Sequence, residues 1–165
     1  MPEAPRIVIS NTTPIIALSI LERLDLLHQL YGEIWIPPAV RAELLRGGTR
    51  AGAQEVQTAA FIRTVPLLSP SQAELLIDLD PGEAEVLALA LERKADLVIL
   101  DERLGRGYAR RLGLALTGVL GVLLRAQQEG YLDALEPEIM RLKQAGIRLG
   151  DDLVARVLQM SGERE

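Results

Sequence analysis

Cysteine is absent from the chain, and histidine occurs once, at His28. Disulfide bonds, thiolate metal ligands and a cysteine nucleophile are therefore excluded, and so is a histidine-rich zinc site. Any metal bound here must be held by oxygen ligands, which favours Mg²⁺ or Mn²⁺ over zinc.

Aromatic residues are also scarce, at 3% of 165 residues, so the core must be built from aliphatic side chains. No run of residues approaches the ~20 apolar positions needed to cross a membrane, and the first residues lack the basic segment of a secretory signal. Hydrophobic residues reach 48% against 25% charged, which is typical of a globular protein. We therefore expect a cytoplasmic protein with no membrane segment.

Basic residues are outnumbered, and the net charge is −5. High-affinity binding of nucleic acid by the whole surface is disfavoured, because that affinity comes mainly from neutralising phosphates. A local basic patch stays compatible with this charge.

Strand-like runs alternate with helical patterns along the chain, which predicts βαβ units and a parallel sheet. We expect strands at about 6–10, 33–36, 61–65, 97–100 and 114–117. We expect helices from about residue 13 to 18, 21 to 31, 38 to 46, 82 to 93, 119 to 129, 136 to 145 and 151 to 160.

The segment 82–93 is apolar almost all round, so a helix there must be covered from several sides. The cover comes either from other helices or from a second copy, and we expect a homodimer built partly on this helix or on the helices beyond Val119. Residues 47–52 are the expected mobile loop. Asp151 is the expected N-cap of the last helix, and the tail 161–165 is expected to be frayed.

Four oxygen-bearing side chains are placed near the expected carboxyl edge of the sheet. Asn11 and Asp101 directly follow strand-like runs, Glu43 lies on the helix after the second strand, and Glu83 opens the helix that precedes Asp101. The crevice at this edge is where open α/β sheets bind ligands. Three carboxylates and an amide at one spot predict a divalent-metal site.

Each of these residues also has a structural interpretation. Asn11 fits the N-cap of a helix beginning near Thr13, and Asp101 fits the cap of the next helix. Glu83 lies where a carboxylate complements the helix dipole, and Glu43 borders a buried stripe and fits a solvated residue. The metal site therefore depends on the joint placement of the four residues.

Arginine is dense after Asp101, with four arginines in the nine residues 103–111. Guanidinium groups suit phosphate, so Arg103, Arg106 and Arg110 are candidate nucleic-acid contacts. The alternative is a solvated helix face. No third glycine follows Gly105-Arg106-Gly107 at the spacing of a dinucleotide-binding loop.

Four stretches of the sequence together resemble the PIN domain (PilT N-terminal domain), and in particular prokaryotic PIN-like proteins that are often paired with a small antitoxin. They are residues 7–18 (IVISNTTPIIAL), 36–44 (IPPAVRAEL), 82–85 (GEAE) and 100–103 (LDER). The resemblance covers about residues 6–125. It implies one PIN-like domain over residues 1–165, with a helical extension at about 126–160.

The resemblance implies a three-layer α/β/α sandwich with a central parallel sheet and a metal-dependent ribonuclease, often toxin-like and dimeric. The family's acidic positions correspond to Asn11, Glu43, Glu83 and Asp101, with Mg²⁺ or Mn²⁺ as cofactor and RNA as substrate. The chain departs from the family at Asn11, where Asp is usual, and this should weaken metal binding without excluding it, because an amide oxygen still ligates hard cations.

Two hypotheses follow. The first is a toxin-like endoribonuclease in which Glu43, Glu83 and Asp101 are catalytic and Asn11 is a weakened fourth metal ligand. The second is a catalytically silent PIN-like module that binds RNA or a protein partner, its metal site disabled at Asn11.

Overall fold

The computed structural model describes residues 6–165 and contains one five-stranded sheet. Its strands are β1 (Val8–Ser10), β2 (Ile34–Ile36), β3 (Ile62–Thr64), β4 (Leu97–Ile99) and β5 (Leu116–Thr117). All five coincide with the expected strands. Their β-branched and aliphatic residues suit a sheet buried on both faces, and Val8, Ile9, Val98 and Ile99 are fully buried.

The helices that precede β4 are α1 (Thr12–Ile20), α2 (Asp25–Tyr31), α3 (Pro38–Arg46), α4 (Ala53–Thr58), α5 (Ser71–Glu74) and α6 (Pro81–Arg93). Those that follow it are α7 (Arg103–Arg111), α8 (Val119–Gln128), α9 (Glu136–Gln144) and α10 (Asp151–Met160). Prolines at the starts of α3, α6 and α9 are pre-organised for the first helical turn.

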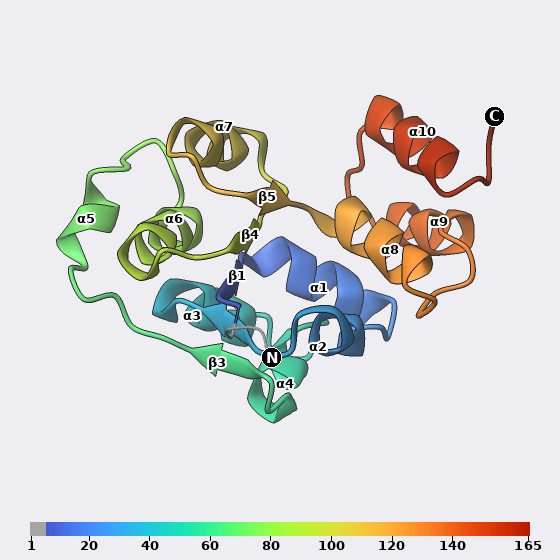
Figure 1. Cartoon of the computed structure of the whole chain (residues 1–165). Coiled ribbons are helices and arrows are strands. Elements are labelled where there is room, and N and C mark those ends of the chain that lie inside the picture. Colours follow the sequence, from blue (N-terminus) through green and yellow to red (C-terminus); the bar gives the residue numbers. More distant parts are fainter. Residues whose placement is uncertain (1–5) are drawn as a thin grey trace, which may run out of the picture.

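The strands are ordered β3-β2-β1-β4-β5, and every pair is parallel. Figure 1 shows α3, α6 and α7 on one side of the sheet and α1, α2 and α8 on the other. The expected three-layer α/β/α sandwich with a central parallel sheet is therefore confirmed. The Asn11 N–H donates to the Ile99 carbonyl at 3.0 Å, so the carboxyl ends of β1 and β4 lie side by side.

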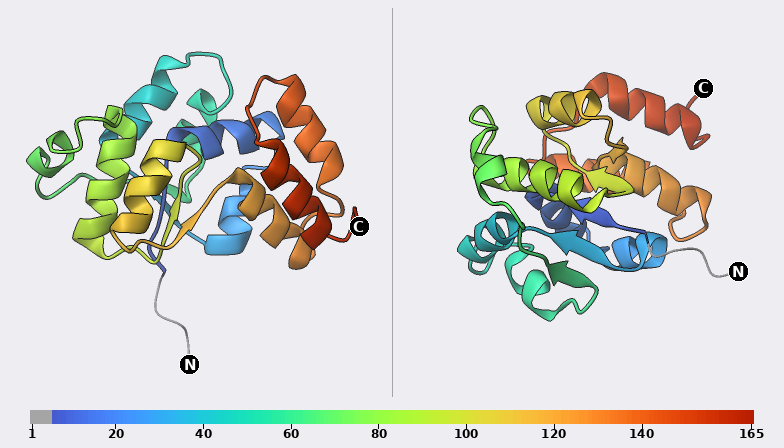
Figure 2. Two further views of the ribbon diagram at one scale, coloured as in Figure 1. Left: turned by 90° about the horizontal axis from the view of Figure 1, so that it is seen from above. Right: turned by 60° about the vertical axis from the view of Figure 1, so that its left-hand side comes forward.

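Helix α3 contacts both α1 and α6, which brings the starts of three helices to the carboxyl edge of the sheet. The arrangement is seen from above and from the side in Figure 2. Three segments far apart in the sequence therefore meet at one place.

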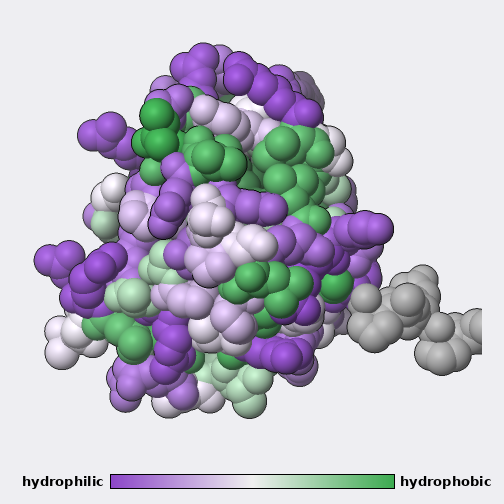
Figure 3. All heavy atoms as spheres, turned by 90° about the vertical axis from the view of Figure 1, so that its left-hand side faces the viewer, coloured by the Kyte–Doolittle hydropathy of each residue, from purple (hydrophilic) through white to green (hydrophobic). Residues whose placement is uncertain are grey.

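The apolar helix α6 is covered by its own chain. It packs on β1 and β4 and is flanked by α3, α5 and α7, and Val86, Leu87 and Leu89 are fully buried. Its all-round apolar pattern therefore needs no second copy. Large apolar side chains are exposed instead around α5, at Leu68, Leu75 and Ile77, and Figure 3 shows separate hydrophobic patches among hydrophilic residues on the face that carries α5.

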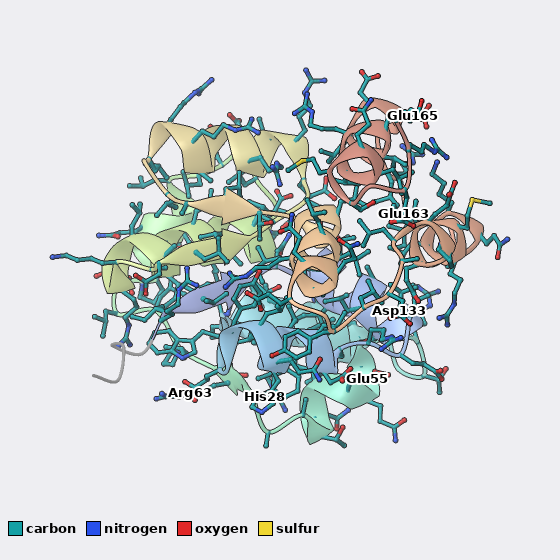
Figure 4. The ribbon with its side chains drawn as sticks, turned by 45° about the vertical axis from the view of Figure 1, so that its right-hand side comes forward. His28, Glu55, Arg63, Asp133, Glu163 and Glu165 are labelled. Carbon is teal, nitrogen blue, oxygen red and sulfur yellow. The ribbon has the colours of Figure 1, made fainter. Side chains whose placement is uncertain are left out.

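The carboxyl-terminal end differs from expectation in two places. Gly150, not Asp151, is the N-cap of α10, and Asp151 is the first helical residue. The tail is docked rather than frayed, because the Glu163 carboxylate accepts hydrogen bonds from the Leu135 and Glu136 N–H groups at 2.9 and 3.0 Å. Figure 4 shows Glu163 beside α9 and α10. Glu163 thus supplies the start of α9 with the carboxylate cap that its own residues lack.

Helices α4 and α5 were not expected from the sequence. Both are short, α4 buries only Ala53 and Val56 and α5 buries no residue, so the apolar periodicity that predicts longer helices is missing. None of the helices in residues 6–165 is long and apolar enough to cross a membrane.

Candidate metal centre

Asn11 stands at the end of β1, in the N-cap position of α1 with extended backbone angles (φ −80°, ψ 178°). Its side chain makes no capping hydrogen bond to the helix. The side chain is only 4% exposed, and Oδ1 is buried without a partner among residues 6–165. A buried acceptor without a donor is costly, so this oxygen is oriented for something other than capping.

The surroundings of Gly82 show where that oxygen lies. A Cβ atom at Gly82 would be 3.1 Å from Glu43 Oε2 and 3.4 Å from both Asn11 Oδ1 and Asp80 Oδ1. Oxygens from β1, α3 and the start of α6 therefore surround a small space that glycine leaves open. We call Asn11, Glu43, Asp80 and Glu83 the oxygen cluster.

Glu43 is exposed on α3 and held by a buried neighbour of Asn11. The Thr12 hydroxyl donates to Glu43 Oε2 at 2.8 Å, and Thr12 is 3% exposed. A hollow of about 360 Å³ opens beside Glu43 and is also lined by Arg46, Asp80 and Gly82. Nothing in the sequence marks Thr12 except its position next to Asn11.

Glu83 is 6% exposed, in the first turn of α6. Burial raises the pKa of its carboxyl group to about 7, and the nearby carboxylates of Asp80, Glu102 and Glu43 act in the same direction. The Asp80 side chain accepts the Glu83 N–H at 2.9 Å, so Asp80 both caps the helix and faces the cluster. A helix-dipole role alone would lower the pKa of Glu83, which is the opposite of the shift found.

Asp101 is turned toward the start of α8. Its Oδ1 and Oδ2 accept the Val119 N–H at 3.0 and 3.3 Å, and a Cβ atom at Gly118 would overlap its carboxylate. Burial raises the pKa of Asp101, whereas the Val119 N–H and the nearby Arg106 oppose that rise. Asp101 thus acts at the start of α8, which follows the neighbouring strand β5, rather than as the cap of α7, whose N-cap is Glu102.

The structure therefore brings Asn11, Glu43, Asp80 and Glu83 close together, with Asp101 engaged next to them at the same edge. Within residues 6–165, no three Asp, Glu or His side chains are already gathered at metal-binding range. The ion pairs found over those residues include none of the acids of the cluster. The cluster thus carries negative charge that no arginine or lysine side chain pairs with in this part of the chain.

The three candidate arginines on α7 differ in their surroundings. Arg106 is half-buried, and its Nη1 donates to the Leu100 carbonyl at 2.9 Å. Arg103 and Arg110 are exposed, and Arg103 lines a surface hollow of about 350 Å³ with Tyr108. Only Arg103 and Arg110 are therefore directed to the surroundings of the protein.

Comparison with protein families shows which family the chain belongs to. A family model described as PIN domain matches residues 7–163, nearly the whole chain. The chain belongs to the PIN domain family. PIN domains are in general nuclease-like and use divalent metals. A search of curated proteins found no match.

The raised pKa of Glu83 predicts how the stability of this PIN domain depends on pH without metal. Between about pH 4.5 and 7 the folded protein keeps a proton on Glu83 that the unfolded chain has lost, so this residue's contribution to stability falls as pH rises through that window. Glu83→Gln, which mimics the protonated form, should be more stable than the wild type at pH 8 by on the order of 1–2 kcal/mol.

Urea unfolding in EDTA across this pH range measures the difference. It should shrink toward zero near pH 4, where Glu83 is protonated in both states. Glu74→Gln, at an exposed acid on α5, is the control and should show no such trend. A pH-independent difference for Glu83→Gln would contradict the shift.

Proposed function

We propose that this PIN-domain chain is a metal-dependent endoribonuclease, toxin-like in type, that hydrolyses RNA phosphodiester bonds with Mg²⁺ or Mn²⁺. The observation that carries the proposal is the buried Oδ1 of Asn11, which has no partner among residues 6–165 and lies next to Glu43 Oε2 and Asp80 Oδ1 around Gly82. Carbonyl and carboxylate oxygens are the ligands that these hard cations prefer. A cation here would give the orphaned oxygen a partner and offset the unpaired negative charge.

In this proposal Asn11, Glu43, Glu83 and Asp101 hold the metal, with Asp80 in reach. The bound ion would activate water and stabilise the charge that develops on the phosphodiester. Thr12 orients Glu43 through its hydrogen bond. The Val119 N–H holds the Asp101 carboxylate in place, and the nearby positive charge of Arg106 favours its ionised form.

Glu83 has a second part in the mechanism. A carboxyl group with a pKa near 7 exchanges a proton readily at neutral pH. Binding of a cation requires this proton to leave. Metal affinity should therefore rise between about pH 6 and 8.

RNA contacts are proposed for the exposed arginines of α7, Arg103 and Arg110, with Arg106 acting through Asp101. We also propose that residues 1–165 form a single domain, since buried Val154, Val157 and Leu158 of α10 join the same hydrophobic core as the sheet. A small antitoxin protein and a second copy of the chain are proposed partners, and the apolar residues exposed around α5 offer contact surface.

The second candidate function is a catalytically silent PIN-like module that binds RNA or protein. The observation that favours it is Asn11 itself, which removes one negative charge from the family's usual acidic set. Metal binding separates the two candidates.

Gly82→Ala tests the metal centre without removing any ligand. Its methyl group would occupy the space among the three oxygens and push them apart. Mn²⁺ affinity should therefore fall at least about 10-fold, because the displaced oxygens can no longer bind the same ion. Calorimetric titration with Mn²⁺ measures this effect. Folding should be retained, since alanine is a better helix former than glycine.

Gly107→Ala is the matched control, because it is also a glycine within a helix and its Cβ would meet nothing within 4 Å. It should bind Mn²⁺ as the wild type does. A wild type that binds no Mn²⁺, or a Gly82→Ala variant that binds it equally well, would count against the site and favour the silent module.

A further inference from the structure

A hollow of about 730 Å³ lies beside the oxygen cluster, between α1, α3, the loop 47–52 and the turn after α9. Ile16, Ile20 and Ile147 give it aliphatic walls, and Arg46 and Arg50 stand exposed at its rim. We call it the side hollow. Its size is within the range of sites that hold small organic groups.

The walls of the side hollow are held by specific contacts. Gly52 has φ +96°, and a Cβ atom there would lie 2.9 Å from the Leu44 side chain and 3.3 Å from that of Ile16. Glycine thus lets the loop lie directly against α1 and α3. On the opposite side, the Arg141 guanidinium donates to the Ile20 and Leu21 carbonyls at 3.5 and 3.4 Å, which ties α9 to the end of α1.

The side hollow shares two lining residues with the candidate metal centre. Glu43 and Arg46 line both the side hollow and the smaller hollow at Asp80 and Gly82. An RNA strand with one phosphodiester at the oxygen cluster would therefore place its next nucleotide in the side hollow. The strand would pass Arg46 and Arg50 on the way. The oxygen cluster is acidic and suits a metal ion, whereas the rim of the side hollow is basic and suits a phosphate.

We propose that the side hollow takes an unpaired nucleobase of the RNA strand that is cut, with Arg46 and Arg50 on the adjoining phosphate. The proposal rests on the ribonuclease function proposed above. Aliphatic walls and guanidinium planes suit the faces of a base, and arginine suits its phosphate. A base that stays paired in a duplex cannot enter, so the strand must be single or locally opened at this nucleotide. The turn after α9 thereby becomes part of substrate selection.

Binding of labelled RNA octamers in EDTA at low salt, measured by fluorescence anisotropy, tests the side hollow apart from cleavage. The probes are the four homopolymers and an octamer of abasic ribose phosphate with the same charge. The best homopolymer should bind about 10-fold more tightly than the abasic probe. Ala145→Trp, at an exposed residue of the wall, should reduce that ratio to about twofold or less by filling the space. Ala51→Phe fills the same hollow and is the variant to test if Ala145→Trp does not fold.

Gln144→Trp is the matched control on the neighbouring exposed position and should keep the wild-type ratio. Arg50→Gln should weaken both kinds of probe equally and reduce the slope of log affinity against log salt by about one. Arg156→Gln, at an exposed arginine of α10, is the control and should leave both the binding of the probes and the salt slope unchanged. A wild type that does not distinguish bases from abasic ribose, or a filled variant that still does, would overturn the proposal.

Cleavage of total RNA with Mn²⁺ by the same variants separates this proposal from the proposed function. Equal cleavage by the wild type and by Ala145→Trp would leave the nuclease standing and remove the base site. Base-dependent binding without any cleavage would support the base site and count against the nuclease function.

Discussion

Glu43→Gln should lower Mn²⁺-dependent RNA cleavage by at least about 100-fold, since it removes a charged oxygen ligand from the proposed site. Glu43 is exposed, and its carboxylate points to the space at Gly82. Its loss should therefore leave the fold intact. Initial rates on total RNA and on a labelled oligonucleotide, together with the thermal unfolding midpoint, measure both effects.

Two further variants show whether the loss is specific. Thr12→Val keeps the carboxylate but removes the hydroxyl that holds it, so cleavage should fall by about 10-fold, as expected for a group that orients a ligand. Glu33→Gln, an exposed glutamate before β2, should have no effect. Cleavage by Glu43→Gln at the wild-type rate would remove Glu43 from the mechanism.

Asn11→Asp should produce the second large change, in opposite directions with and without metal. A fourth carboxylate at a site only 4% exposed and already acidic should destabilise the metal-free protein at pH 8 by on the order of 1–3 kcal/mol. With the cation bound the added charge becomes favourable, so Mn²⁺ affinity should increase by about 10-fold or more. Cleavage should increase with it.

Thermal unfolding in EDTA and in Mn²⁺ measures this crossover, and calorimetry measures the affinity. Asn11→Ala is the control and should lose affinity without the destabilisation caused by charge. Adding Asp101→Asn to Asn11→Asp should abolish the gained cleavage. Should Asn11→Asp bind Mn²⁺ no better, and should neither protein cut RNA, the silent binding module becomes the better description.

The sheet was predictable because strand formation here depends on local composition. Runs such as residues 7–10 and 97–100 consist almost entirely of β-branched and aliphatic residues. A strand that is buried on both faces needs such a run, regardless of which elements pack against it. The short helices α4 and α5 carry no such pattern. The docking of Glu163 onto the start of α9 joins residues 27 or 28 positions apart in the chain, so no local pattern announces it.

The candidate site divides in the same way. The choice of Asn11, Glu43, Glu83 and Asp101 follows from strand ends and helix starts, which a parallel sheet collects at one edge. The direction in which each side chain points depends on contacts between elements. Asp101 is bound by the N–H of Val119, 18 residues later, and Glu43 is held by Thr12, 31 residues earlier.

By itself, the sequence determined that the chain forms a parallel α/β sheet with an aliphatic core, belongs with PIN domains, and has no cysteine ligand for a metal. Only the tertiary structure decided that Asn11 Oδ1 is buried without a partner among residues 6–165, that Gly82 leaves the space in front of it open, and that Asp80 joins the cluster. Composition and periodicity act within a segment, whereas burial, the pKa of Glu83 and the convergence of oxygens arise from segments packed against one another.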